Sequence, residues 1–217
     1  MNQKPHILIA QERPFSRNYE SVLEYLKMPY TTALTPDTPN SYDVLLLPGG
    51  GDLYPGLYTE HNEGSRNIEA AKDLLQLTLL DDFIKRKKPI MGICKGFQLL
   101  QIYFGGDLVQ DLIPASSHYH PENDILHPAD NKKGSILDDI YGSSCIINSC
   151  HHQAVLYPAP GLQVIQTGPE QVIEAMVHSA LPVLGLQWHP ERLCLQFRHP
   201  DAVDGLLIFQ HFLHVYL

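Results

Sequence analysis

This 217-residue sequence is poor in basic residues and contains no long hydrophobic run. Fifteen lysines and arginines stand against 24 aspartates and glutamates, which gives a formal net charge of −9. Because nucleic-acid binding needs a basic surface that neutralises phosphates, we expect no nucleic-acid partner. No apolar run approaches the roughly 18 residues that a transmembrane helix needs, and no signal peptide is recognisable, so we also expect no membrane contact.

Cysteine is scarce, and its spacing excludes some common uses. The four cysteines (Cys94, Cys145, Cys150 and Cys194) form no Cys-x-x-Cys pair, which is the usual mark of zinc and thioredoxin-like redox sites. Without a secretory signal, the chain belongs in a reducing compartment, where disulfides are rare. We therefore expect a soluble, cytoplasmic protein.

The sequence does contain alternating apolar runs and amphipathic segments. Several apolar runs lack polar alternation, which is typical of parallel strands covered on both faces. This order predicts a single α/β domain over residues 1–217, with a mainly parallel central sheet, helices on both faces and a small antiparallel elaboration. Strands are predicted at 6–10, 30–34, 43–48, 89–93, 144–149, 163–167, 172–178 and 183–188, and helices at 16–27 (with Ser16 as N-cap), 67–86, after Cys94 and at the C-terminal end.

A polar stretch at residues 107–143 is predicted to consist mainly of loops. It contains His118, His120 and His127 among prolines and acidic residues. A His-x-His pair can bind a metal, but no cysteine or carboxylate completes a recognisable ligand spacing. We therefore expect no metal site.

Residues 89–106 carry the most informative motif of the chain. Pro89 to Ile93 is typical of a buried strand, and a helical pattern follows directly. Between them, Gly-Ile-Cys-Lys-Gly (92–96) places Cys94 in a sharp turn between two small residues. This is the thiol version of a nucleophile elbow, where the helix N-terminus favours a thiolate. A small core cysteine beside two packing glycines is the alternative, and the pentapeptide alone leaves both open.

A histidine and a glutamate follow another predicted strand. In Gln-Trp-His-Pro-Glu (187–191), His189 and Glu191 are two residues apart, so an extended backbone would place both side chains on one side. A carboxylate so placed can orient a histidine base and stabilise its imidazolium. Alternatively, His189 is an ordinary strand-end histidine beside a surface glutamate.

A glycine-rich loop follows a third predicted strand. Leu-Pro-Gly-Gly-Gly-Asp (47–52) offers N–H groups without neighbouring Cβ atoms, which can form an oxyanion hole or simply a turn. Open α/β sheets place their sites beyond the carboxyl ends of the strands. Since all three stretches follow strands, we expect them to converge at one edge of the sheet.

Four motifs together resemble the class I glutamine amidotransferase superfamily. Within it, the resemblance is closest to the gamma-glutamyl-gamma-aminobutyrate hydrolase family of cysteine peptidases, and it runs from about residue 5 to the C-terminal helix. It implies a flavodoxin-like three-layer sandwich. The motifs are Leu-Pro-Gly-Gly-Gly-Asp, Gly-Ile-Cys-Lys-Gly-Phe-Gln, Asn-Ser-Cys-His-His-Gln-Ala-Val and Gln-Trp-His-Pro-Glu.

The resemblance also implies roles for individual residues. Cys94 would be the nucleophile, His189 the acid/base and Glu191 its orienting carboxylate. The oxyanion would be held by the backbone N–H of Lys95 together with that of Gly50 or Gly51. The gamma-glutamyl pocket would be lined by Gln98, Ser149, His151 and His152.

Two positions depart from the family pattern. Hydrolase relatives often carry an Arg-Asp pair and a glutamate on the helix before the elbow, where this chain has Lys72-Asp73 and Gln76. These departures bear on the particular substrate and not on the chemistry.

The function implied is hydrolysis of a small gamma-glutamyl amide through a Cys94 thioester, releasing glutamate and an amine. No cofactor is required, and a homodimer is left open. Two alternatives remain: a glutaminase subunit that delivers ammonia to a separate synthetase, and a non-catalytic binding or stress-response protein on the same scaffold.

Overall fold

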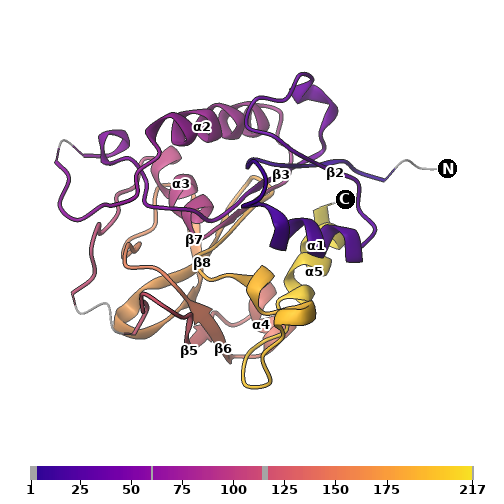
Figure 1. Ribbon diagram of the computed structural model, residues 1–217. Helices are drawn as coiled ribbons and strands as arrows, with labels where there is room; N and C mark the ends of the chain where they lie inside the picture. Colours follow the sequence, from indigo (N-terminus) through magenta and orange to yellow (C-terminus); the bar gives the residue numbers. More distant parts are fainter. Residues whose placement is uncertain (1–3, 60, 114–116, 217) are drawn as a thin grey trace.

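The computed structural model describes residues 4–59, 61–113 and 117–216 (Figure 1). These residues form a nine-stranded sheet with the order β2-β1-β3-β4-β9-β8-β7-β5-β6. The strands are β1 (Ile7–Ile9), β2 (Tyr30–Thr32), β3 (Val44–Leu47), β4 (Ile90–Ile93), β5 (Ile125–Asn131), β6 (Ser144–Ser149), β7 (Leu162–Thr167), β8 (Ile173–His178) and β9 (Val183–Leu186). The helices are α1 (Arg17–Tyr25), α2 (Ala70–Lys85), α3 (Lys95–Tyr103), α4 (Ile136–Tyr141) and α5 (Leu206–Tyr216), with short 3₁₀ turns η1 (Pro39–Ser41), η2 (Pro55–Leu57), η3 (Pro169–Gln171), η4 (Pro190–Arg192) and η5 (Leu195–Phe197).

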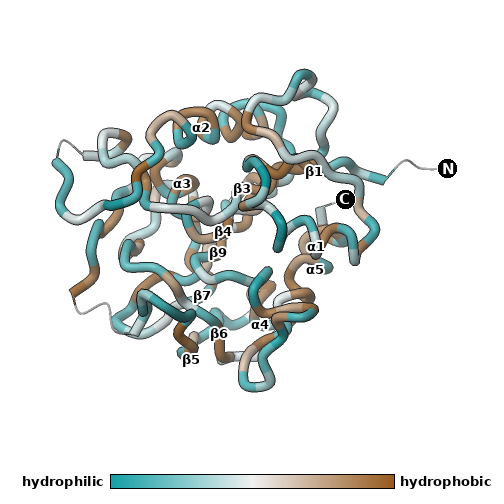
Figure 2. Tube along the Cα trace, in the orientation of Figure 1, coloured by the Kyte–Doolittle hydropathy of each residue, from teal (hydrophilic) through white to brown (hydrophobic). Residues whose placement is uncertain are grey.

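One half of the sheet is parallel. Strands β2, β1, β3, β4 and β9 pair in parallel, with Gly92 of β4 opposite Gly185 of β9. Every residue of β1, β3, β4 and β9 is buried. Figure 2 shows hydrophobic colouring concentrated along these strands. The runs that the sequence predicted as doubly covered strands therefore form the interior of the molecule.

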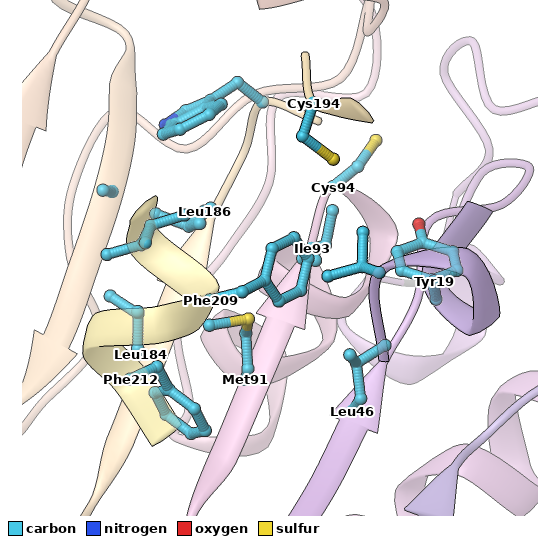
Figure 3. Close-up of a cluster of buried hydrophobic side chains, with 14 of the residues drawn as sticks. Tyr19, Leu46, Met91, Ile93, Cys94, Leu184, Leu186, Cys194, Phe209 and Phe212 are labelled. Carbon is cyan, nitrogen blue, oxygen red and sulfur yellow. The ribbon is translucent and has the colours of Figure 1, made fainter. Parts of the chain in front are cut away.

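Helices cover both faces of this parallel half (Figure 1). On one face, α2 and α3 pack on the sheet through residues such as Phe83 and Leu99. On the other face, α1 and α5 pack through residues such as Leu23 and Phe209. Figure 3 shows Cys94 at the end of this second cluster, directly after β4. The α/β, flavodoxin-like prediction is confirmed.

The other half of the sheet is antiparallel. Strands β8, β7, β5 and β6 continue the sheet beyond β9 through antiparallel pairings. These strands bury polar side chains that the parallel strands lack, among them His127, Asn131, Gln166 and Glu174. Each buried polar group needs a partner, so this half is held by specific polar contacts as well as by apolar packing.

The prediction that residues 107–143 form mainly loops is wrong at its C-terminal end. This stretch contains β5 and α4, and the Ser135 hydroxyl caps α4 by accepting the Asp138 N–H at 3.3 Å. Strand β5 has the sequence Ile-Leu-His-Pro-Ala-Asp-Asn, whose proline and polar residues hide its strand character. Its antiparallel pairing with both β6 and β7 stabilises the extended conformation that the local sequence does not favour.

Two smaller findings complete the description. Ser16 occupies the N-cap position of α1, but its hydroxyl donates to the Glu20 carboxylate at 2.5 Å and makes no backbone capping bond. Within the described residues, no helix is both long and apolar enough to cross a membrane.

Candidate active site

The backbone at Cys94 has the strained geometry of an elbow. Cys94 stands between β4 and α3 with φ 51° and ψ −104°, a left-handed conformation that is rare for a residue with a side chain. Gly92 and Gly96 make the turn possible: a Cβ on Gly92 would lie 2.6 Å from Gly96 O, and a Cβ on Gly96 would lie 2.2 Å from Leu47 O. The glycines at 92 and 96 are therefore steric requirements of the turn.

His189 and Glu191 form a buried pair. His189 Nδ1 and Glu191 Oε1 are 2.7 Å apart, and both residues are 2% exposed. The expectation that they meet across an extended segment is wrong, because β9 ends at Leu186 and Pro190–Arg192 form the 3₁₀ turn η4. Pro190 has no N–H with which to continue the ladder. The turn, not strand alternation, brings the two side chains together.

Charge at this pair favours the imidazolium. Burial alone would lower the pKa of His189, but the Glu191 carboxylate and the neighbouring Cys94 raise it to about 10. An imidazolium held next to a thiol sulfur is an acid that can protonate a leaving group.

Gly49 separates the thiol from the imidazole. A Cβ placed on Gly49 would lie 2.8 Å from His189 Cε1 and 3.5 Å from Cys94 Cβ, so both side chains border one small space. The Gly49 N–H donates to the Tyr19 hydroxyl at 2.9 Å, which fixes the start of the glycine loop. A larger residue at position 49 would occupy the space that the thiol and the imidazole share.

The glycine loop lies against the first turn of α3. Gly50 packs on the Lys95 side chain, whose Cδ would be 3.2 Å from a Cβ at position 50. Lys95 is the first residue of α3, so its N–H has no acceptor within the helix. Among the described residues, the N–H groups of Gly50 and Gly51 likewise donate to no protein acceptor. The three predicted oxyanion donors therefore border one region.

The Lys95 side chain is held in a buried ion pair. Lys95 and Asp73 are 1% and 0% exposed, and Lys95 Nζ contacts Asp73 Oδ1. The other Asp73 oxygen accepts the Tyr54 N–H at 2.8 Å. The nearby Gln76, at the second departure from the family pattern, donates to Ala10 O at 2.8 Å. Asp73 and Gln76 thus hold the scaffold beneath the glycine loop, while Lys72 lines the larger cavity described next.

Two cavities meet at Cys94. The larger, of about 350 Å³, is lined on the catalytic side by Cys94, His189 and Glu191, and elsewhere by Phe15, Asn18, Lys72 and Arg192. The smaller, of about 140 Å³, is polar. Its lining includes Asp52, Arg66, Gln98, His151 and His152. Cys94, Gly50 and Gly51 border both cavities. The thiol therefore stands at the boundary between two binding spaces.

The predicted pocket residues are placed differently from one another. Gln98 and His152 line the smaller cavity, and His152 lies between two carboxylates, 2.9 Å from Asp52 and 2.9 Å from Asp111. The hydrogen bond to Asp52 raises the pKa of His152. His151 also lines this cavity, but its Nε2 faces Glu174. Ser149 lines neither cavity, because its hydroxyl is buried and donates to His118 O at 2.7 Å.

Several supporting residues were not identified from the sequence. Asn148 accepts the His189 N–H at 3.0 Å and donates to Asp124 at 2.9 Å. Asp124 in turn accepts from Arg192 at 2.9 Å, and Arg192 Nε lies 3.7 Å from Glu191. A local signal existed for Asn148, which opens the Asn-Ser-Cys-His-His-Gln-Ala-Val motif, and for Arg192, which directly follows the His-Pro-Glu motif. The arrangement as a whole supplies a thiol, an oriented imidazole and backbone donors, as amide hydrolysis by a cysteine requires.

Comparison with known families supports this chemistry. Residues 28–191 match the family model described as Peptidase C26. The chain is 34% identical to the "Putative glutamine amidotransferase-like protein YvdE" of Lactococcus lactis over 156 residues, 69% of this chain and 66% of that protein. It is 28% identical to the gamma-glutamyl-gamma-aminobutyrate hydrolase PuuD of Escherichia coli K12, over 69% of this chain and 64% of that protein. The alignments thus span about two thirds of the length of these relatives.

A solved structure supports the fold. The crystal structure of a protein from Thermoplasma acidophilum, described as a "putative gmp synthase subunit a protein", superposes with a TM-score of 0.72 at 18% identity. The superposition covers 99% of this chain and 94% of that one. Together, the relatives support a cysteine-dependent amide hydrolase or glutamine amidotransferase-like protein.

Proposed function

Because the chain belongs to the peptidase C26 family, we propose that it hydrolyses a small gamma-glutamyl amide through a thioester on Cys94. The observation that carries this proposal is the position of Cys94 at the boundary of a smaller polar cavity and a larger one. An amide-cleaving enzyme needs one space for each side of the scissile bond, with the nucleophile between them.

The smaller cavity suits the glutamyl side. A gamma-glutamyl group carries one ammonium and one carboxylate at its far end, and the cavity offers the Asp52 carboxylate and the Arg66 guanidinium. Gln98 and His152, whose pKa is raised by its hydrogen bond to Asp52, add polar contacts nearby. An apolar acyl group would leave these polar side chains without partners, which disfavours it.

The larger cavity suits the amine. At about 350 Å³ it has room for a group much larger than ammonia, and Phe15 and Asn18 give it mixed polarity. Lys72 and Arg192 also line this cavity, so an amine that carries a carboxylate would find cations there. The compound named in one relative's description, gamma-glutamyl-gamma-aminobutyrate, has such an acid on its amine side.

The mechanism follows from the positions of the groups. The Cys94 thiolate attacks the delta-carbonyl carbon, and the N–H groups of Lys95 and of Gly50 or Gly51 stabilise the oxyanion, at roughly 3–4 kcal/mol per donor. The His189 imidazolium protonates the departing amine, leaving a gamma-glutamyl thioester. Neutral His189 then takes a proton from water, whose oxygen attacks the thioester, and glutamate and the thiolate are released. Glu191 keeps the imidazole oriented throughout.

The test is glutamate release by the purified chain from glutamine and from gamma-glutamyl amides of increasing size, including one with an acidic amine. We expect kcat/KM to be higher for the larger amides than for glutamine. Hydroxylamine should divert the thioester to gamma-glutamyl hydroxamate, and Cys94→Ala should remove both products, whereas Cys145→Ala should not.

Three outcomes would count against the proposal. These are glutamine preferred over every conjugate, release that survives Cys94→Ala, and no release from any amide. The first would instead favour a glutaminase that supplies ammonia to a partner.

A further inference from the structure

Four buried side chains converge in the antiparallel half of the molecule. His118 lies in the loop before β5, His127 on β5, His151 after β6 and Glu174 on β8, and none is more than 5% exposed. Glu174 Oε1 lies at their centre. It is 3.3 Å from His118 Nδ1, 3.6 Å from His127 Nε2 and 3.7 Å from His151 Nε2.

Hydrogen bonds on the outer side of each ring fix its tautomer. Each imidazole directs its second nitrogen to a backbone carbonyl oxygen, and such an oxygen can only accept, so that nitrogen carries the proton. In the neutral ring, the nitrogen that faces Glu174 then holds a bare lone pair. The pairs are His118 Nε2 with Pro169 O at 3.3 Å, His127 Nδ1 with Pro128 O at 3.0 Å, and His151 Nδ1 with Gln153 O at 2.9 Å.

The inner atoms of the cluster have no hydrogen-bond partner. This is true of the three inner ring nitrogens and of both Glu174 oxygens, all of which are buried. Three lone pairs and a carboxylate that face one another repel unless a cation lies between them. A protonated histidine could supply the charge, but it would donate to Glu174 at about 2.7–2.9 Å, shorter than any of the three distances.

The spacing fits a metal ion instead. Bonds of about 2.0–2.2 Å to a tetrahedral ion place neighbouring ligand atoms roughly 3.3–3.5 Å apart. The distances from Glu174 Oε1 to His118 Nδ1 (3.3 Å) and to His151 Nε2 (3.7 Å) lie close to that edge length. We propose that His118, His151 and Glu174, whose ligand atoms all lie within 4.8 Å of one another, bind a divalent transition-metal ion. Zn²⁺ is the ion best suited to two imidazoles and a carboxylate, and His127 faces Glu174 from beside this site. Mg²⁺ and Ca²⁺ are disfavoured because they prefer oxygen ligands.

The outer hydrogen bonds are those of a metal site. Ligating histidines usually donate their other N–H to a carbonyl or carboxylate, which orients the ring and strengthens the ligand. His118 Nε2 also lies 3.1 Å from the Glu170 carboxylate, in addition to Pro169 O. Of the His-x-His pair noted in the sequence, only His118 belongs to this site, because His120 is exposed and accepts the Glu122 N–H.

The ion has a positioning role in the fold. The three ligands are buried and come from separate segments of the chain. The ion ties β8 and the loop before β5 to the segment after β6, in which His151 precedes His152 of the smaller cavity. Removing it is therefore expected to loosen one wall of that cavity while leaving Cys94 and His189 in place.

Metal content of the purified chain tests the proposal. The chain is stripped with a chelator, reloaded with Zn²⁺ or Co²⁺, and analysed by elemental analysis and visible absorption. We expect one ion per chain, a thermal midpoint that rises on reloading, and the ligand-field spectrum of tetrahedral Co²⁺ with nitrogen and oxygen ligands. His118→Gln and Glu174→Gln should each weaken binding by more than the roughly 10–100-fold that loss of an outer-shell partner costs, while His120→Gln and Cys94→Ala should retain one ion.

Clear results would overturn the site. These are a chain that takes up no Zn²⁺ or Co²⁺ after stripping, binding that survives both ligand variants, and binding lost in Cys94→Ala. If a ligand variant fails to fold, the wild-type Co²⁺ spectrum decides alone. A thiolate charge-transfer band would place the ion at a cysteine and contradict the proposal.

Discussion

The two halves of the sheet are built on opposite principles. In the parallel half, β1, β3, β4 and β9 bury every residue, and all of these residues are apolar or glycine. In the antiparallel half, the strands bury a glutamate, a histidine and several amides. The strands of the parallel half are therefore held by apolar packing, whereas those of the antiparallel half also depend on matched polar partners. The candidate active site lies at the carboxyl end of the parallel half, on the rigid packed side of the molecule.

This contrast explains where each kind of group is placed. The proposed nucleophile follows β4 and the proposed base follows β9, two adjacent strands whose register is fixed by tight packing. The antiparallel half supplies Asn148, which holds the His189 backbone, and His152, which lines the smaller cavity. The apolar half fixes the reacting groups, and the polar half supplies contacts around them.

The largest effect is expected at the end of β4. Cys94→Ala should lower kcat for gamma-glutamyl amide hydrolysis by at least about 10⁴-fold, because no other group can form the thioester. Its thermal midpoint should change little, since a small side chain is lost from a site that opens into two cavities. Cys145→Ala, in the antiparallel half, is the matched control and should keep wild-type turnover. Equal loss in the two variants would contradict the assignment of the nucleophile.

The next effect tests a buried polar contact in the parallel half, the ion pair beneath the glycine loop. Lys95→Met leaves the Asp73 carboxylate buried without its cation, which should lower the free energy of unfolding by about 3–5 kcal/mol. Denaturant unfolding measures this. Lys95→Met combined with Asp73→Asn should recover part of the loss, and Lys85→Met at an exposed pair should cost less than about 1 kcal/mol. An equal cost at the two lysines would mean that the buried pair does not contribute.

A third prediction compares the two interiors directly. Gln166 donates to Asn131 and accepts from the Trp188 indole, both at 2.8 Å. Gln166→Met has nearly the same volume but leaves the Asn131 side-chain oxygen and the Trp188 indole N–H without partners. Each loss should lower the free energy of unfolding by about 1–3 kcal/mol. Leu45→Met in β3, a hydrophobic exchange of similar volume, should lower the free energy of unfolding by less than about 1.5 kcal/mol. Equal unfolding free energies for the two variants would remove the distinction between the halves.

The smallest effect concerns pH. Glu191 helps to raise the pKa of His189 to about 10, so the imidazolium persists up to that pH and its proton is lost above it. Glu191→Gln removes this attraction while burial still lowers the pKa of His189. The alkaline limb of kcat/KM should therefore fall near pH 10 in the wild type and at lower pH in the variant.

Two comparisons frame this measurement. Glu122→Gln, at an exposed position, should leave the profile unchanged. Identical alkaline limbs for wild type and Glu191→Gln would show that the carboxylate does not control the proton on His189.

The parallel half was predictable because its signal is local. Val-Leu-Leu-Leu in β3 is apolar at every position, and Ile-Met-Gly-Ile in β4 contains only apolar residues and one glycine. Each run can therefore be recognised as a buried strand without knowledge of its distant partners. Strand β5 was missed because its stability comes from elsewhere: Asn131 pairs with Gln166 of β7 through their side chains. A residue whose partner is distant in sequence gives no local pattern.

The residues of the candidate site also fall into those that a local motif predicted and those that it did not. Cys94, His189 and the glycine loop were proposed from short motifs that follow strands, and the structure brings them to one edge of the sheet. Their supports could not be proposed, because Asn148, Asp73 and Tyr19 act through contacts that close only in the folded chain. Glu174 was not singled out for the same reason.

The strand order has a consequence for how the molecule is synthesised. Strand β9 is the last strand along the chain, yet it lies at the centre of the sheet between β4 and β8. Until the ribosome has released β9, β4 keeps an unpaired edge, and the two halves have no strand to join them. The turn that carries His189 follows β9 and emerges later still. A nascent chain therefore contains Cys94 before it contains His189, and the proposed activity can begin only when β9 has closed the sheet.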